Sequence, residues 1–137
     1  MNVPIAIAVL TTAVVSLSLS DLAPEFRDSV AESTEIIDAI IVRIWDDGGV
    51  KLDVRDVIMG KFIPKSLRPR HGQRLEDVFD VDGRYLIFLY DHYYVETHSI
   101  FEIEERQDGV FCRCGEKGEW LDTKALQGLV VGDVRLN

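Results

Sequence analysis

The sequence is poor in cysteine and proline, and it lacks the short motifs of the common catalytic and nucleotide-binding sites. Two Cys and four Pro in 137 residues exclude a disulfide-rich scaffold and a proline-rich extended chain. No G-x-S-x-G elbow, H-E-x-x-H helix, Gly-rich phosphate loop or EF-hand calcium loop occurs. The sequence therefore predicts no cofactor and gives no reason to expect an enzyme.

Positive charge is scarce as well. Fifteen Lys and Arg stand against 24 Asp and Glu, so the net charge is −9 and the pI is about 4.7. Sequence-independent binding to nucleic acid or anionic lipid requires positive charge, so we expect neither partner. One basic run is an exception, although such runs usually form a solvated loop or edge. Its members are Lys61, Lys65, Arg68, Arg70, His71 and Arg74.

Charge is absent from the first 20 residues, in which an apolar and small-residue run spans 5–19. The run is too short and too rich in Ala, Ser and Thr for a membrane span of about 20 apolar residues. Small residues at Ser18 and Ser20 suit cleavage before Asp21. We therefore expect residues 1–20 to be a signal peptide and 21–137 to form one extracytoplasmic domain, secreted or periplasmic, without stable membrane insertion. An uncleaved anchor or a hydrophobic first strand is the alternative, because no Lys or Arg precedes the run.

The segment 36–57 fixes the fold class. Two β-branched runs flank an Asp/Gly turn, which predicts a β-hairpin with a three-residue loop over 46–48 and a left-handed Gly48. After Val54 the alternation slips by one residue, which indicates a β-bulge near Arg55. The alternative is a strand that ends there.

The first run of this hairpin alternates less clearly than the second. We expect Ile40, Val42 and Ile44 to share the buried face. Directly opposed residues point to the same side of a sheet, and pairing Ile44 with Val50 places both apolar series on that side. The competing two-residue turn would oppose Arg43 to an apolar residue, and we reject it for that reason.

The remaining pattern predicts a mainly β fold with a short helix at each end. Apolar residues at helical spacing after Pro24 predict a helix that ends near 33–34, and Asp122 can cap a second helix over 123–130. The run 84–90 is apolar on both faces, as in a central strand covered on two sides. Further strands are expected over 66–70, 93–97, 100–104 and 110–114.

Several features of residues 34–90 occur together in a recognisable order. They are a hydrophobic strand that ends at Trp45, the run Val50-Lys51-Leu52-Asp53-Val54, the run Val57-Ile58-Met59-Gly60-Lys61, Pro64, and the run Gly83-Arg84-Tyr85-Leu86-Ile87-Phe88-Leu89. In this order they resemble netrin-like domains, which are OB-fold relatives of the tissue inhibitors of metalloproteinases and also occur in exported bacterial proteins. The resemblance implies a small OB-like β-barrel that binds other proteins.

The chain departs from that family at its amino terminus. Some members inhibit metalloproteases by placing an amino-terminal Cys on the active-site zinc. The expected mature terminus here is Asp21, and no Cys precedes Cys112. The disulfides of the animal members are also missing, so we do not expect this inhibitory chemistry.

Cys112 and Cys114 are the only cysteines, and on a strand they point to the same face. Their Cα atoms would lie about 6.6 Å apart, near the upper limit for a disulfide. Three alternatives stay open: structural thiols, a redox-active or intersubunit disulfide, and a metal site completed by His92 or His98.

Aromatic residues gather around the turn that follows the 84–90 strand. Alternation sends Tyr93 and Tyr94 to opposite sides, so at least one ring should face outward, although core packing is the usual role of such rings. We predict a partner-binding surface of Tyr90, His92, Tyr93 and Tyr94, together with the segment 61–74. The expected partner is a protein, and a carbohydrate is the second candidate.

No set of residues converges on a reaction, so the sequence predicts an exported, non-enzymatic binding module. It leaves the ligand open. The alternative function is a thiol-dependent redox or metal-handling protein that uses Cys112 and Cys114.

Export can be tested on the mature chain. Expression of the full sequence in a secreting host is expected to give a product that begins at Asp21, because Ser18 and Ser20 supply the small side chains that signal peptidase requires. Intact-mass measurement of the secreted product determines this terminus. A product that retains residues 1–20 would contradict the predicted signal peptide.

Overall fold

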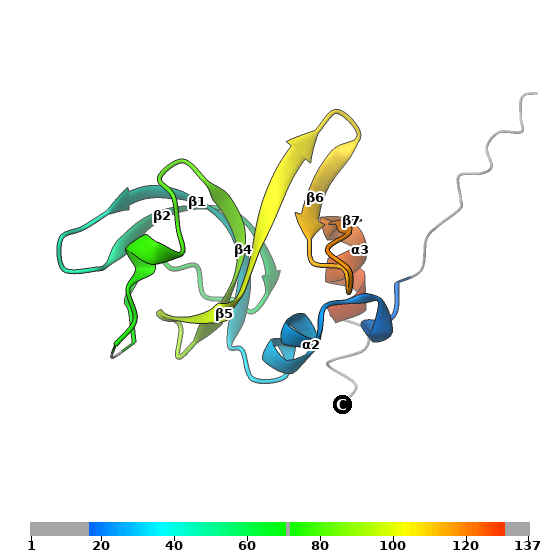
Figure 1. Cartoon of the computed structure of the whole chain (residues 1–137), viewed down its shortest axis with the longest axis horizontal. Helices are drawn as coiled ribbons and strands as arrows, with labels where there is room; N and C mark the ends of the chain where they lie inside the picture. The colour runs from blue at the N-terminus through cyan, green and yellow to red at the C-terminus, as the bar shows by residue number, and fades with distance from the viewer. Residues whose placement is uncertain (1–16, 71, 131–137) are drawn as a thin grey trace, which may run out of the picture.

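The computed structural model describes residues 17–70 and 72–130, without the side chains of residues 96 and 98. Most of the predicted signal peptide, and His71 of the basic run, lie outside the described residues. The chain forms one seven-stranded antiparallel sheet in the order β3-β2-β1-β4-β5-β6-β7, with two short α-helices beside it (Figure 1). The prediction of a mainly β fold is confirmed.

The two predicted helices are both present. Pro24 occupies the first position of one, which ends three residues earlier than predicted, and the Asp122 side chain accepts from the Lys124 backbone N–H at the start of the other. The helices are η1 Leu19–Asp21, α2 Pro24–Val30, η2 Leu75–Asp77 and α3 Thr123–Leu129. The strands are β1 Glu35–Ile44, β2 Val50–Met59, β3 Ser66–Leu67, β4 Arg84–Tyr90, β5 Tyr94–Arg106, β6 Gly109–Arg113 and β7 Trp120–Asp122.

The β1–β2 hairpin has the predicted register. Ile44 opposes Val50, and the Trp45 N–H donates to the Gly49 carbonyl at 2.8 Å. Gly48 has a φ of +90°, so the three-residue loop takes the left-handed conformation that favours glycine at this position.

The predicted bulge in β2 is also confirmed. Val54 opposes Ala39 and Asp56 opposes Asp38, so Arg55 is the extra residue. The strand continues beyond this point, and the alternative of a strand that ends near Arg55 is wrong.

The predicted buried face of β1 is wrong. Ile41 is fully buried, whereas Ile40 is only half-buried and Val42 is exposed. The register slips by one residue between Ile41 and Arg43, so Val42 is itself a bulge and reverses the alternation. Because Val42 follows two other β-branched apolar residues, this slip leaves no trace in the hydrophobic pattern.

Strand β4 is the central strand and is covered on both sides, as predicted. Its residues 85–89 are buried, and alternate side chains enter two separate cores. The first core lies within β1–β5 and η2 and consists of Ile37, Ala39, Ile41, Val50, Leu52, Leu67, Leu75, Phe79, Tyr85, Ile87, Leu89 and Val95. The second lies beneath α2, β6 and α3 and includes Phe26, Val30, Ile36, Ile58, Leu86, Phe88, Ile103, Cys112, Cys114, Leu126 and Leu129.

Strand β5 is one long strand, and the prediction of separate strands over 93–97 and 100–104 is wrong. Its pairing with β4 is interrupted where residues 96–99 oppose Phe88 alone. There the buried Ser99 hydroxyl bonds to the Ser29 hydroxyl and donates to the Glu25 carbonyl of α2. The irregularity is therefore the place where α2 docks on the sheet.

A buried ion pair joins β1 to β4. The Asp38 side chain is 3% exposed, and its two oxygens accept from Arg84 Nε and Nη2 at 2.8 and 2.7 Å. This bidentate geometry is the strong form of a carboxylate–guanidinium pair. The hydrogen bond to Asp38 raises the pKa of Arg84, and burial opposes this. Glu105 adds a weaker contact to the guanidinium at 3.2 Å.

Removing Arg84 should therefore destabilise the fold. We expect Arg84→Gln to lower the free energy of unfolding by about 3–5 kcal/mol, because the Asp38 carboxylate stays buried without its partner. Arg55→Gln is the control, since the Arg55–Asp53 pair is half exposed and should contribute about 0–1 kcal/mol. Urea unfolding of both variants measures the difference, and equal losses would contradict the structural role of Arg84.

Candidate functional site

The predicted binding residues lie together at the β4–β5 turn. Tyr93 and Tyr94 are 43% and 36% exposed, and the His92 side chain is half exposed. Tyr90 ends β4 and is half-buried. More than one ring therefore faces outward at this turn.

The backbone of the turn is unusual. Asp91 and His92 have φ values of 52° and 70°, and the Tyr93 N–H donates to the Tyr90 carbonyl at 3.3 Å. Asp and His tolerate the left-handed region better than most residues, but each non-glycine residue held there costs about 1–3 kcal/mol. The surrounding contacts must therefore hold the turn in place.

A buried carboxylate supplies those contacts. The Glu35 side chain is only 3% exposed, and its Oε2 lies 2.6 Å from His92 Nδ1. The Thr34 hydroxyl donates to Glu35 Oε1 at 2.6 Å and accepts from the His92 backbone N–H at 3.2 Å. Each oxygen of the buried Glu35 carboxylate thus has a hydrogen-bond partner, and the turn is fixed to the start of β1.

Gly60 brings the chain that follows β2 against the same place. Its φ is +98°, and a Cβ atom there would lie 2.8 Å from Glu35 Cγ and 2.8 Å from the Thr34 carbonyl oxygen. Any side chain would displace this segment from β1.

Aromatic rings meet where these segments converge. The Phe62 ring centroid lies 5.0 Å from that of His92 and 5.5 Å from that of Tyr93, and the Arg70 guanidinium lies 4.7 Å above the Tyr90 ring. Such edge contacts and cation–π contacts stabilise a preformed arrangement of rings. We call these rings the aromatic surface, which consists of Phe62, Tyr90, His92, Tyr93 and Tyr94.

The segment around β3 is attached to the same turn through its backbone. The Arg68 N–H donates to the Tyr93 carbonyl at 3.1 Å, and Arg68 and Tyr94 form a parallel β-bridge. Gln73 Nε2 donates to the Val95 carbonyl at 3.3 Å. Figure 1 shows this green segment beside the start of β5. Two stretches far apart in the sequence therefore form one surface.

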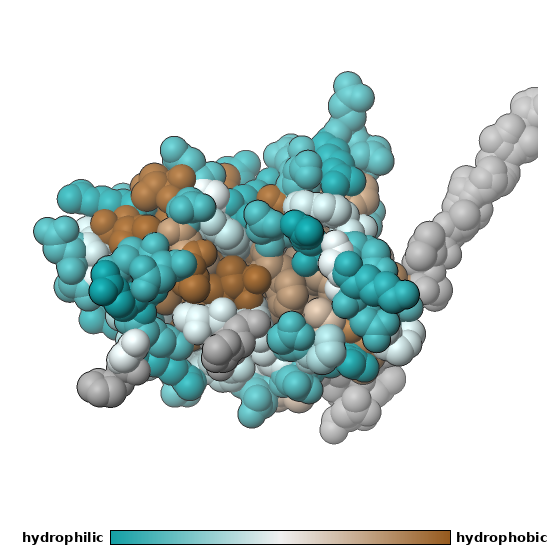
Figure 2. Space-filling view, in the orientation of Figure 1, coloured by the Kyte–Doolittle hydropathy of each residue, from teal (hydrophilic) through white to brown (hydrophobic). Residues whose placement is uncertain are grey.

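Other hydrophobic residues are exposed elsewhere. Figure 2 shows them gathered over the strands β1–β5, within a mainly hydrophilic exterior. Val42 and Val81 are among the exposed aliphatic residues, and both lie beyond the Ile40–Arg84 pair, at the end of β1 and β4 opposite to the β4–β5 turn.

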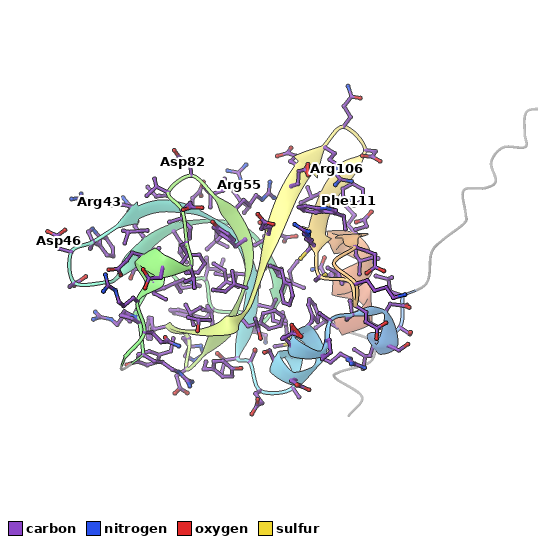
Figure 3. The ribbon with its side chains drawn as sticks, in the orientation of Figure 1. Arg43, Asp46, Arg55, Asp82, Arg106 and Phe111 are labelled. Carbon is purple, nitrogen blue, oxygen red and sulfur yellow. The ribbon has the colours of Figure 1, made fainter. Side chains whose placement is uncertain are left out.

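Two hollows flank Arg84, and the ion pairs of Arg84 and Arg113 lie in their walls. One of about 610 Å³ lies between the loop before β4 and Trp120, and one of about 340 Å³ lies between β2 and the start of α3. Arg84 is bound by Asp38, and Arg113 lies 3.6 Å from Glu102. Beside the first hollow, Arg106 stacks on Phe111 at 4.8 Å (Figure 3). These two ion pairs join β4 to β1 and β6 to β5.

Cys112 and Cys114 are free thiols, and both are fully buried in the second core. Burial raises the pKa of the Cys112 thiol well above its usual value, and a hydrogen bond to Cys114 adds to this. A reactive cysteine needs an accessible thiolate, which this environment disfavours. Among the described side chains, which do not include that of His98, no three His, Cys, Asp or Glu residues are grouped to hold a metal ion.

Sequence reasoning missed two residues that build the aromatic surface. Phe62 lay within the predicted segment 61–74 but was not singled out, and its place between the breakers Gly60 and Pro64 was the available indication. Glu35 was missed altogether, although a carboxylate at the edge of a hydrophobic run suggests a buried partner.

Comparison with protein-family models, with curated proteins and with solved structures gives no match for this chain. Within the described residues, no helix has the length and apolar character needed to cross a membrane.

The thiols give a direct test of the second core. Iodoacetamide is expected to leave Cys112 and Cys114 unmodified in the native protein and to alkylate both in urea, because both side chains are fully buried. Mass spectrometry after a short pulse measures the modification. Rapid alkylation of the native protein would show an accessible thiol and favour the thiol-dependent function.

The raised pKa of Cys112 also predicts a pH dependence of stability. Between the unfolded thiol pKa of about 8.5 and the higher folded value, only the unfolded chain ionises, so the free energy of unfolding should fall as pH rises. Below pH 8 this contribution should be constant. Cys112→Ala should remove this part of the pH dependence, as measured by urea unfolding between pH 7 and 10. If the free energy of unfolding of the variant fell with pH as steeply as that of the wild type, the raised pKa of Cys112 would be contradicted.

Proposed function

We propose that the chain is an exported, non-enzymatic binding module that recognises a protein partner through the aromatic surface. The observation that carries this proposal is the exposed cluster of Phe62, His92 and Tyr93, whose rings contact one another across two distant segments. Aromatic side chains are enriched where proteins meet and often dominate the binding energy. A carbohydrate, which also stacks on exposed rings, is the second candidate partner.

We further propose that strands β1–β5 form an OB-like barrel, as the resemblance to netrin-like domains implies. The strand order β3-β2-β1-β4-β5 and the parallel bridge between Arg68 and Tyr94 support this proposal, because an OB barrel is a partly open five-stranded barrel. On this arrangement the aromatic surface lies where β3 approaches β5.

The binding function is preferred to the thiol-dependent alternative for a physical reason. The aromatic surface is exposed and held by Glu35, Thr34 and Gly60, so it is ready to bind without rearrangement. Cys112 and Cys114 would have to leave the second core to react. Export of the chain is inferred from the sequence of residues 1–20, the expected signal peptide.

Loss of the exposed rings should weaken partner binding without unfolding the protein. We expect Phe62→Ala combined with Tyr93→Ala to weaken capture of an extracytoplasmic protein at least tenfold, because hot-spot rings each contribute about 2 kcal/mol or more. The tagged mature chain would be cross-linked in the culture or envelope fraction of its source, and captured proteins quantified by mass spectrometry.

Val42→Ala combined with Val81→Ala is the matched control, since both side chains are exposed elsewhere. It should leave capture unchanged, and both double variants should keep the wild-type melting temperature within a few degrees. Equal capture by all three proteins would overturn the proposed surface.

A further inference from the structure

The segment 61–74 has a charge opposite to that of the rest of the chain. It contains five Lys and Arg and no Asp or Glu, whereas the whole chain carries −9, which leaves −14 for all other residues. The structure folds this segment onto the β4–β5 turn. Within the described residues, this segment gives an otherwise acidic protein a cationic area that adjoins the aromatic surface.

Most of this positive charge is not neutralised within the described part of the molecule. Arg74 alone forms an ion pair, with Glu76 at 3.0 Å and Asp77 at 3.6 Å. The other four side chains are exposed and have no carboxylate partner among the described side chains: Lys61, Lys65, Arg68 and Arg70. They can therefore pair with carboxylates that a ligand supplies.

The cations lie next to the rings. Arg70 stacks on Tyr90, Arg68 is the bridge neighbour of Tyr94, and Tyr90 and Tyr94 oppose each other across β4 and β5. Cross-strand partners point to the same side of a sheet. Arg68 and Arg70 therefore lie beside two rings of the aromatic surface.

We infer that the partner binds through a short acidic segment, in which Asp or Glu residues are interspersed with aromatic or aliphatic ones. This inference rests on the proposed function and names the chemistry of the partner at the same surface. Carboxylates would pair with Arg68 and Arg70 in charge-assisted hydrogen bonds. An apolar side chain would pack against Phe62 and Tyr93.

A short peptide fits these charges better than a nucleic acid. A nucleic acid carries charge at every nucleotide and would extend past the cationic area. There it would meet Asp91, which is exposed in the turn, as well as Glu76 and Asp77. An acidic stretch of a few residues can end before it reaches them.

Selection from a displayed library of random 12-residue peptides tests this inference without a known partner. The mature chain is immobilised, bound peptides are enriched, and the charge of the recovered sequences is compared with that of the input. The inference predicts enrichment of peptides with a net charge of −3 or lower. A representative peptide is then synthesised with a fluorescent label, and its Kd is measured by anisotropy.

Two double variants test whether the segment 61–74 binds the peptide. Arg68→Gln combined with Arg70→Gln should weaken the peptide about tenfold, and raising NaCl from 50 to 500 mM should weaken it further. Arg55→Gln combined with Arg113→Gln removes the same charge from half-exposed sites elsewhere and should change the Kd less than twofold. Both variants retain the backbone hydrogen bond from Arg68, and their melting curves check the fold.

The possible results separate the inference from the proposed function. Recovery of neutral or basic peptides whose binding requires Phe62 and Tyr93 would overturn the acidic partner and leave the binding module standing. Recovery of no peptide would count against both. A single-stranded dT12 oligonucleotide that binds more tightly than the selected peptide would replace the acidic peptide by a nucleic acid.

Discussion

The bending of the sheet is the constraint on which the rest of the structure depends. Strands β3 and β5 are four positions apart in the sheet order, so they would lie about 19 Å apart in a flat sheet. The 3.1 Å hydrogen bond from the Arg68 N–H to the Tyr93 carbonyl requires the sheet to bend, so that the residue after β3 lies beside the residue before β5. Bulges supply that curvature, and the β1–β2 ladder contains three of them, at Val42, Arg55 and Ile58.

The sequence predicts some of these bends and hides others, for a simple reason. At Arg55 the extra residue places two polar side chains in succession, and the alternation visibly slips. At Val42 the extra residue follows Ile40 and Ile41, which are also apolar. The slip in alternation is therefore hidden, and the predicted buried face of β1 was wrong. Residues 96–99 gave the opposite error, because a polar stretch opposite Phe88 resembled a turn although the strand continues.

The same distinction applies to the candidate site. The four predicted residues at the β4–β5 turn adjoin one another in sequence, so local pattern was enough to identify them. The pair of Glu35 with His92 joins positions 57 residues apart, and it exists only because β1 and β4 pair so that Glu35 opposes Leu89. Contacts of this kind depend on strand register, which single-sequence patterns do not determine beyond one hairpin.

Strand β1 carries two buried carboxylates, Glu35 and Asp38. The partner of one is mostly buried, and the partner of the other is half exposed. Asp38 pairs with Arg84, which is 16% exposed, and this pair serves the packing of β1 on β4. Glu35 instead pairs with a half-exposed His92 in a turn whose two left-handed residues are not glycine. A turn that only connected two strands would be more stable with Asn-Gly at those positions. In this turn His92 instead binds the buried Glu35 and Tyr93 is exposed beside it, so a buried hydrogen bond, and not glycine, offsets the strain of the two left-handed residues.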